Sequence, residues 1–223
     1  MGAAIRREDV AVPLAGAVLD GDLVVPANAG GIVVFAHGSG SGRHSPRNRL
    51  VAERLNAVGL GTLLFDLLTA EEEREDLKSG RLRFDIDLLG DRVTAGLDWL
   101  RAELGPQTAP VGCFGASTGA AAALIAAAER PEVVRAVVSR GGRPDLAPAA
   151  LLGEVRAPTL LIVGADDAPV IEMNRAAQGA MRAETRLEIV PGATHLFEEP
   201  GKLEQVADLA REWFLRHLSS EDR

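Results

Sequence analysis

The chain has 223 residues, with 24 basic against 32 acidic side chains and a formal net charge of −8. This length suffices for a sizeable core, and the acidic balance disfavours a nucleic-acid partner. The single cysteine excludes an intrachain disulfide. No two of the four histidines have the helical spacing of metal ligands, so we expect no metal site.

The N-terminal residues carry charges where a signal peptide needs an apolar stretch. Residues 104–128 form an uncharged segment long enough to cross a membrane, but prolines and glycines interrupt it. A strand, a sharp turn and a helix account for this segment better than a membrane span does. We therefore expect a cytoplasmic protein with no membrane partner.

The predicted elements begin with an antiparallel hairpin over residues 9–25, with Asp20 and Gly21 as its turn. Short continuous apolar runs then recur, as is typical of parallel strands covered on both faces. These predicted strands are residues 31–36, 62–65, 110–114, 133–138, 159–163 and 187–190.

Helical patterns alternate with these strands, and their apolar residues recur every three or four positions. The predicted helices are residues 46–58, 85–104, 117–130, 170–183 and 202–218. The alternation predicts an α/β fold with a mostly parallel sheet. We find no repeat, linker or break in composition, so we expect a single domain over residues 1–223.

The most irregular stretch is residues 68–83, which is rich in charged side chains. Such a run is usually a solvated face. Because it follows a strand on the side where α/β proteins bind ligands, a mobile flap over residues 69–83 is the alternative.

Residues 115–119, Gly-Ala-Ser-Thr-Gly, match the pattern G-x-S-x-G between a predicted strand and a predicted helix. This is the context in which a strained turn lifts a nucleophilic serine out of the sheet. Side chains at Gly115 and Gly119 would collide with the neighbouring strand and helix. The pattern predicts Ser117 as a nucleophile, with a small-residue helix packed on a sheet as the alternative.

A serine nucleophile needs a base, and His195 lies in the loop between the last predicted strand and the last helix. The other late histidine, His217, lies near a helix C-terminus, where a dipole interaction suffices. Two adjacent carboxylates, Asp166 and Asp167, follow the penultimate strand, and either one could orient the imidazole. The order of serine, acid and histidine is that of α/β-hydrolases.

Two backbone N–H groups are needed to hold an oxyanion. We expect one from Thr118, which follows the nucleophile, and one from Ser39 in the glycine-rich loop of residues 37–42. This loop lacks the lysine and spacing of a phosphate-binding loop. His37, which begins the loop, suits a bracing role.

On these residues the chain resembles the α/β-hydrolase superfamily, and within it the dienelactone-hydrolase-like group. The resemblance runs from residue 32 to residue 218. It rests on residues 37–48, 115–119, 164–170 and 191–201. It implies the α/β-hydrolase fold, with roughly eight mostly parallel strands and helices on both faces, and hydrolysis through an acyl-enzyme without a cofactor.

The acid of this superfamily usually fits G-x-x-D-x-x-V, which falls on Gly164, Asp167 and Val170, so the resemblance favours Asp167. One departure concerns the nucleophile. Dienelactone hydrolases proper use cysteine, whereas this chain has Ser117, so their lactone substrate is not carried over.

The stretch between the strand ending at residue 138 and the one beginning at 159 leaves no room for a lid domain. An open site favours small or exposed esters. Several basic side chains near the expected site are candidates for binding an anionic substrate, and salt bridges to local acids are the favoured alternative. These candidates are Arg43, His44, Arg47, Arg140 and Arg143.

The sequence therefore predicts an enzyme that hydrolyses carboxylic esters of a small-molecule substrate with Ser117, Asp167 and His195. An acyltransferase or peptidase using the same three residues is one alternative. A ligand-binding protein on an idle hydrolase scaffold is another. The sequence leaves the natural substrate and the oligomeric state open.

Overall fold

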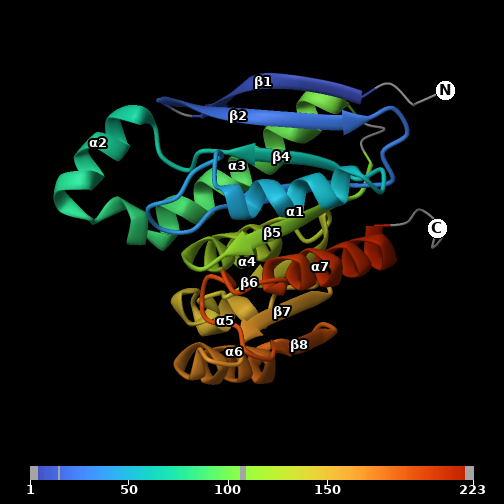
Figure 1. Cartoon of the computed structure of the whole chain (residues 1–223). Coiled ribbons are helices and arrows are strands. Elements are labelled where there is room, and N and C mark those ends of the chain that lie inside the picture. The colour runs from blue at the N-terminus through green and yellow to red at the C-terminus, as the bar shows by residue number, and fades with distance from the viewer. Residues whose placement is uncertain (1–4, 15, 106–108, 219–223) are drawn as a thin grey trace.

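The structure, a computed structural model, describes residues 5–14, 16–105 and 109–218. Residue 15 of the predicted hairpin and residues 106–108 of the uncharged segment lie outside this part. Eight strands form one sheet in the order β1-β2-β4-β3-β5-β6-β7-β8 (Figure 1). The strands are β1 Ile5–Leu14, β2 Ala17–Pro26, β3 Ile32–Ala36, β4 Gly61–Phe65, β5 Val111–Ala116, β6 Val134–Arg140, β7 Thr159–Gly164 and β8 Thr185–Val190.

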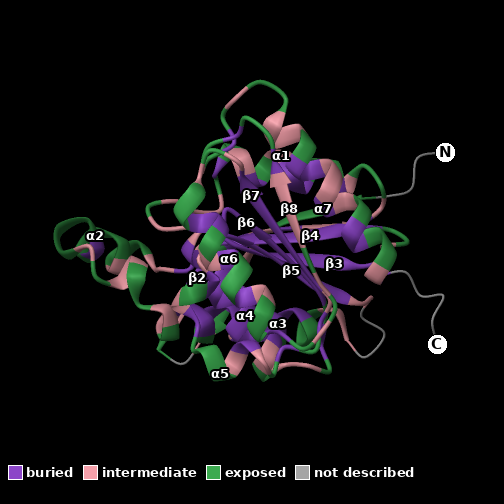
Figure 2. Cartoon of the chain, turned by 90° about the horizontal axis from the view of Figure 1, so that it is seen from below, coloured by how far each residue is buried: buried purple, intermediate pink, exposed green. Residues whose placement is uncertain are grey.

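The strand directions confirm the predicted sheet. β2 runs antiparallel to both β1 and β4, whereas β3 to β8 are parallel to one another. The central strands β3, β4, β5 and β7 are buried along their whole length, as their apolar runs predicted (Figure 2).

Helices cover both faces of the sheet. The helices of the described chain are α1 Pro46–Asn56, α2 Ala70–Ser79, α3 Ile86–Leu104, α4 Thr118–Glu129, α5 Ala149–Leu152, α6 Ala168–Ala180 and α7 Lys202–Leu218. One apolar core lies under α1 and α7, and a second lies between the sheet and α3 and α4 (Figure 1). The sheet is therefore the middle of three layers. The loops that follow the carboxyl ends of the parallel strands lie along one edge of it.

The predicted hairpin turn at Asp20 and Gly21 is wrong. Both residues lie inside β2, and the two strands meet where Leu14 pairs with Ala17. A side-chain carbon at Gly21 would lie 3.1 Å from Phe65 Cβ. This glycine therefore serves a close approach of β2 to β4, which is the other common reason for glycine within a strand.

The charged stretch after β4 is an ordered helix, not an irregular loop. α2 begins with a capping box, in which Glu72 N–H donates to Thr69 Oγ1 and Thr69 N–H donates to Glu72 Oε2. It ends at Gly80, whose left-handed conformation suits a helix C-cap. α2 extends away from the body of the molecule (Figure 1). The T-x-x-E pattern at residues 69–72 was the sequence signal for this helix.

The connection between β6 and β7, all of whose residues are described, contains a 3₁₀ turn at Pro144–Leu146 and the four-residue α5. The predicted absence of a lid domain at this place is thus confirmed. Within the described residues, the structure contains no helix of the length and apolar character needed to cross a membrane.

Two helical glycines allow a matched test of the packing. A side-chain carbon at Gly96 of α3 would lie 2.8 Å from Phe65 Cζ, whereas one at Gly179 of α6 meets no atom within 4 Å. We expect Gly96→Ala to lower the free energy of unfolding by about 1–3 kcal/mol through overpacking. Gly179→Ala should raise it by about 0.5–1 kcal/mol, because alanine loses less backbone entropy. Denaturant titration measures both, and changes of the same sign would contradict the described packing.

Candidate active site

Ser117 occupies a strained turn between β5 and α4. Its φ of 51° lies in the left-handed region, where a serine is uncommon. A side-chain carbon at Gly115 would lie 2.4 Å from Ala120 Cα, and one at Gly119 would lie 2.2 Å from Ala36 O. The predicted collisions with helix and neighbouring strand are confirmed, so the G-x-S-x-G pattern reflects steric necessity.

A chain of hydrogen bonds joins the three side chains that the sequence singled out. His195 Nε2 lies 3.3 Å from Ser117 Oγ, and His195 Nδ1 lies 2.7 Å from Asp167 Oδ2. A carboxylate accepts only, so the proton is on Nδ1 and the Nε2 lone pair faces the hydroxyl. Asp166 is exposed and is not the partner of His195.

Two glycines bring the loop of His195 against its neighbours. A side-chain carbon at Gly164 would lie 2.2 Å from Ala193 O, and one at Gly141 would lie 2.9 Å from His195 O. Gly141 also has a positive φ of 50°. The ends of β6 and β7 therefore touch this loop through backbone contacts that larger residues would prevent.

The loop is also held from within by residues that the sequence reasoning missed. Phe197 is buried and has a φ of 58°, and its ring lies in the core under α1 and α7. Glu199 Oε1 accepts from Thr194 N–H at 3.2 Å and from Thr194 Oγ1 at 2.6 Å. An aromatic residue and an acid shortly after a loop histidine were the available signal. These contacts keep His195 in place.

The predicted oxyanion donors lie together, but one of them is engaged. Thr118 is the first residue of α4, where N–H groups have no acceptor within the helix. Ser39 N–H, however, donates to Thr118 Oγ1 at 3.0 Å. In this conformation the N–H of Ser39 is therefore occupied, and an oxyanion gains this donor only if the threonine hydroxyl releases it.

The hydroxyl groups extend this contact to the segment after α2. Ser39 Oγ lies 3.1 Å from Arg83 O and 2.9 Å from Thr118 Oγ1. Arg83 O can only accept, so Ser39 Oγ–H donates to it and Thr118 Oγ–H donates to Ser39 Oγ. Arg83 is in turn held by the buried Asp76 of α2. The oxyanion loop is thus linked to α2.

Three of the five basic candidates are engaged with other side chains, mainly carboxylates. Arg43 pairs with Asp66, and its backbone N–H also donates to that carboxylate. Arg143 makes two parallel 2.8 Å contacts with Asp145. His44 is exposed and accepts from Arg49. For these three, the salt-bridge interpretation holds.

The remaining two arginines have fewer carboxylate contacts. Arg47 contacts Glu198 at 3.0 Å, and its Nε, like that of Arg43, is buried without a hydrogen-bond partner among the described residues. Arg43 Nε, however, lies 3.5 Å from Asp22. Arg140 is only 6% exposed, and its Nε and Nη1 have no hydrogen-bond partner among the described residues. Burial first, and the charge of Arg47 second, lower the pKa of Arg140 to about 10. The guanidinium therefore stays charged at neutral pH.

Two other side chains of types that often carry chemistry, His37 and Cys113, have structural roles here. His37 Nε2 accepts from Leu67 N–H at 2.9 Å, and Nδ1 donates to Gly38 O at 3.0 Å, which confirms the predicted bracing role. Burial raises the pKa of the Cys113 thiol to about 12, which makes it unreactive. Over the described ranges, no three His, Cys, Asp or Glu side chains are grouped to hold a metal ion.

Comparison with known proteins follows this geometry. A family model described as an alpha/beta hydrolase domain matches residues 29–213. A dienelactone hydrolase structure from Anabaena variabilis is 57% identical, covers 96% of this chain and 99% of its own, and superposes with a TM-score of 0.93. The Est1E structure from Butyrivibrio proteoclasticus shares 17% identity over 94% of this chain and 98% of its own, with a TM-score of 0.77, and supports the fold alone.

The chain therefore belongs to the α/β-hydrolase family, and it is dienelactone-hydrolase-like. Two Mycobacterium tuberculosis proteins, from strains CDC 1551 and H37Rv, are 56% identical over 214 residues and carry the provisional name phosphoribosyl transferase. The match covers 96% of this chain but 47% of those proteins. The chain thus spans about half the length of these curated relatives.

The buried His37 predicts a pH dependence of stability. Burial lowers its pKa below the ordinary value of 6.5, so the folded protein holds it neutral while the unfolded chain protonates it. Its contribution is complete above about pH 6.5 and is lost as the pH falls toward the folded pKa, by at most about 1.4 kcal/mol per pH unit. We expect His37→Gln to flatten this slope in denaturant titrations between pH 7 and 5.

His217 supplies the control. Burial also lowers its pKa, but it lies in the last turn of α7 and is only half-buried. His217→Gln should therefore keep most of the slope. If the slope survives in His37→Gln and disappears in His217→Gln, the assignment to His37 is wrong.

Proposed function

We propose that this chain is a serine hydrolase that cleaves carboxylic esters of small molecules through an acyl-enzyme. The observation that carries the proposal is the hydrogen-bonded chain of Ser117, His195 and Asp167 on a strained turn. The family membership and the fold of known esterases support a hydrolase. The serine on its turn supports acyl transfer to Oγ.

In the proposed reaction, His195 Nε2 takes the Ser117 proton while Oγ attacks the ester carbonyl. The imidazolium, held by Asp167, then gives this proton to the departing alkoxide, which leaves the acyl group on Ser117. Water next gives a proton to Nε2 and attacks the acyl carbonyl. The proton returns to Oγ as the carboxylic acid departs.

The developing oxyanion needs donors already in place. Thr118 N–H at the start of α4 is the first, and the positive end of the helix dipole adds to it. Ser39 N–H is the second once Thr118 Oγ1 turns away from it. Turning this hydroxyl away breaks two neutral hydrogen bonds, from Ser39 N–H to Thr118 Oγ1 and from Thr118 Oγ–H to Ser39 Oγ, each worth about 1 kcal/mol.

The space beside the oxyanion loop supports a small substrate. A cavity of about 190 Å³ borders Ser39 and is lined in part by Leu68, Leu77 and Leu89. Its lining does not include Ser117 or His195, so we propose that a short acyl or alcohol group bound at Ser117 extends into it past Ser39. The short connection between β6 and β7 leaves the site open on its other side.

The name of the Mycobacterium relatives suggests a second activity, phosphoribosyl transfer. Those proteins are about twice as long as the matched region, and this chain matches the alpha/beta hydrolase domain over residues 29–213. We propose that any phosphoribosyl transfer belongs to the part of those relatives outside the match. The hydrolase geometry would then be a separate activity of the shared part.

The nucleophile is tested with p-nitrophenyl esters from acetate to laurate. We expect Ser117→Ala to lower kcat/KM by about 10⁴-fold or more, because the reaction then has no acyl acceptor. Ser79→Ala, at the exposed end of α2, is the control and should match the wild type. Equal rates for Ser117→Ala and wild type would place the chemistry elsewhere. No wild-type turnover of any ester would contradict ester hydrolysis.

The choice of acid is tested on the same esters. Asp167→Asn should lower kcat by about 10⁴-fold, because the amide favours the wrong imidazole tautomer. Asp166→Asn removes the neighbouring exposed carboxylate and should change kcat less than about twofold, as surface changes usually do. A larger loss in Asp166→Asn than in Asp167→Asn would contradict the assignment.

A further inference from the structure

The most unusual charge in the described molecule is Arg140, the last residue of β6. Its side chain is nearly fully buried, and two of its nitrogens lack any hydrogen-bond partner in the described part of the chain. A buried guanidinium is costly unless an anion compensates it. Arg43 and Arg143, two other arginines that the sequence suggested for this role, are paired with carboxylates. Arg47 contacts the carboxylate of Glu198 through Nη1.

Arg140 starts from a backbone position beside the nucleophile. It pairs with Ala116 across the sheet, and Ser117 N–H donates to Arg140 O at 3.1 Å. The guanidinium therefore belongs to the same edge of the sheet as the Ser117 hydroxyl. A substrate bound to Ser117 would therefore lie close to the backbone of Arg140.

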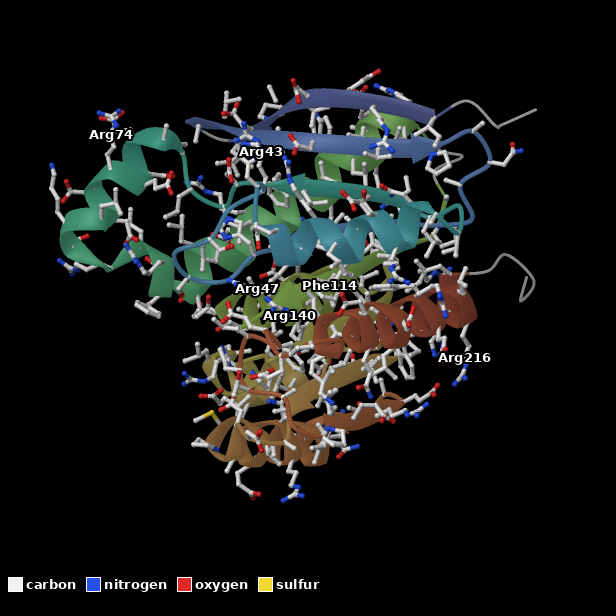
Figure 3. All side chains as sticks on the ribbon, in the orientation of Figure 1. Arg43, Arg47, Arg74, Phe114, Arg140 and Arg216 are labelled. Atoms are coloured by element: carbon white, nitrogen blue, oxygen red, sulfur yellow. The ribbon has the colours of Figure 1, made fainter. Side chains whose placement is uncertain are left out.

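Arg47 lies close to Arg140, on the same face of the sheet. Ala136 and Val138 of β6 lie in the core under α1 and α7, so strand alternation directs Arg140 to that face as well. Arg47 is in the first turn of α1, and the two arginines lie near each other (Figure 3). Arg47 Nε is also buried and has no hydrogen-bond partner among the residues that the structure describes. The two guanidinium groups thus have three nitrogens without such a partner there.

Within the described part of the chain, the carboxylate that contacts this pair is Glu198, and it is replaceable. Glu198 holds Arg47 at 3.0 Å, but its side chain is 63% exposed. A ligand anion can displace it into solvent without leaving a buried charge behind. No ion pair of Arg140 with a carboxylate occurs within residues 5–14, 16–105 and 109–218.

We propose that Arg140 and Arg47 form a subsite for an anionic group of the substrate, so that the enzyme prefers esters carrying a carboxylate or phosphate near the scissile carbonyl. The proposal rests on the proposed ester hydrolysis and adds its substrate class. A guanidinium binds either oxyanion through parallel hydrogen bonds, which explains why the site uses arginine. Arg43, His44 and Arg143 take no part.

The test compares three acetyl esters of similar phenols. 4-Acetoxybenzoate carries a carboxylate, 4-acetoxyphenyl phosphate carries a phosphate, and 4-acetoxybenzamide is the neutral match. We expect kcat/KM for at least one anionic ester to exceed that for the amide by about tenfold or more, through KM, as charge-assisted hydrogen bonds allow. The ester with the larger ratio identifies the oxyanion.

The variants assign this preference to the two arginines. Arg140→Gln and Arg47→Gln should each lower the ratio by about tenfold, because they weaken binding of the anionic esters more than binding of the amide. Arg49→Gln removes an exposed charge of the same helix, which is paired with Asp22, and should keep the ratio. If Arg140→Gln fails to fold, the test rests on Arg47→Gln, because Arg47 is less buried. Glu198→Gln then adds a second readout and should raise the ratio, because it removes the carboxylate that competes for Arg47.

The possible failures are distinct. Turnover of all three esters at equal rates, or an equal loss on charged and neutral esters in both arginine variants, overturns the subsite and leaves ester hydrolysis standing. If the wild type hydrolyses none of them, ester hydrolysis fails and the subsite is tested by binding. Benzoate or inorganic phosphate should then raise the Tm of Ser117→Ala but not that of its Arg47→Gln double variant. No rise in Ser117→Ala overturns the subsite.

Discussion

The backbone contact at the turn of Ser117 is the constraint on which the rest of the site depends. Gly119 lies so close to Ala36 O, and Gly115 so close to Ala120, that no side chain fits at either position. β3, β5 and α4 are therefore in direct backbone contact around the turn. This contact holds Ser117 at a positive φ that costs on the order of 1–3 kcal/mol, and it raises the hydroxyl above the sheet. The alanine-rich α4 permits it, since small side chains let the helix lie close to the strands.

The parallel sheet supplies the remaining groups at the same edge. The strands β3 to β8 are parallel, so the loops with Ser39, Ser117, Asp167 and His195 all follow carboxyl ends of strands. Glycines at the ends of β6 and β7 then bring the histidine loop into contact with its neighbours. The imidazole is positioned by sterics and by the buried Phe197, and the carboxylate fixes its tautomer.

Arginines around the site are paired with carboxylates, and Arg140 is the exception among the described residues. Arginines near carboxylates are paired with them, as Arg43 with Asp66 and Arg143 with Asp145 show. Such pairs reduce the cost of removing each charge from water. Arg140 is buried deeper than these and has no such partner among the residues described, which is the basis of the anion subsite proposed above.

The sequence by itself determined most of the order of strands and helices and singled out Ser117 and His195 as the candidate nucleophile and base, because these predictions depend on local patterns. An apolar run predicts a buried strand, and glycines two residues on each side of Ser117 predict a tight turn. The sequence also contained the capping box at Thr69 and Glu72, which predicts α2 once it is recognised.

Only the tertiary structure decided questions that depend on distances between remote residues. A glycine such as Gly21 is compatible with a turn or with a close contact between strands. Because Phe65 lies against Gly21, the close strand contact is the explanation. Asp166 and Asp167 are adjacent in sequence, and the direction of their side chains selects Asp167 as the partner of His195. Whether Ser39 N–H is free, and which arginines lack a carboxylate, follows from the packing of segments far apart in the chain, because hydrogen bonds and ion pairs act only over a few ångströms.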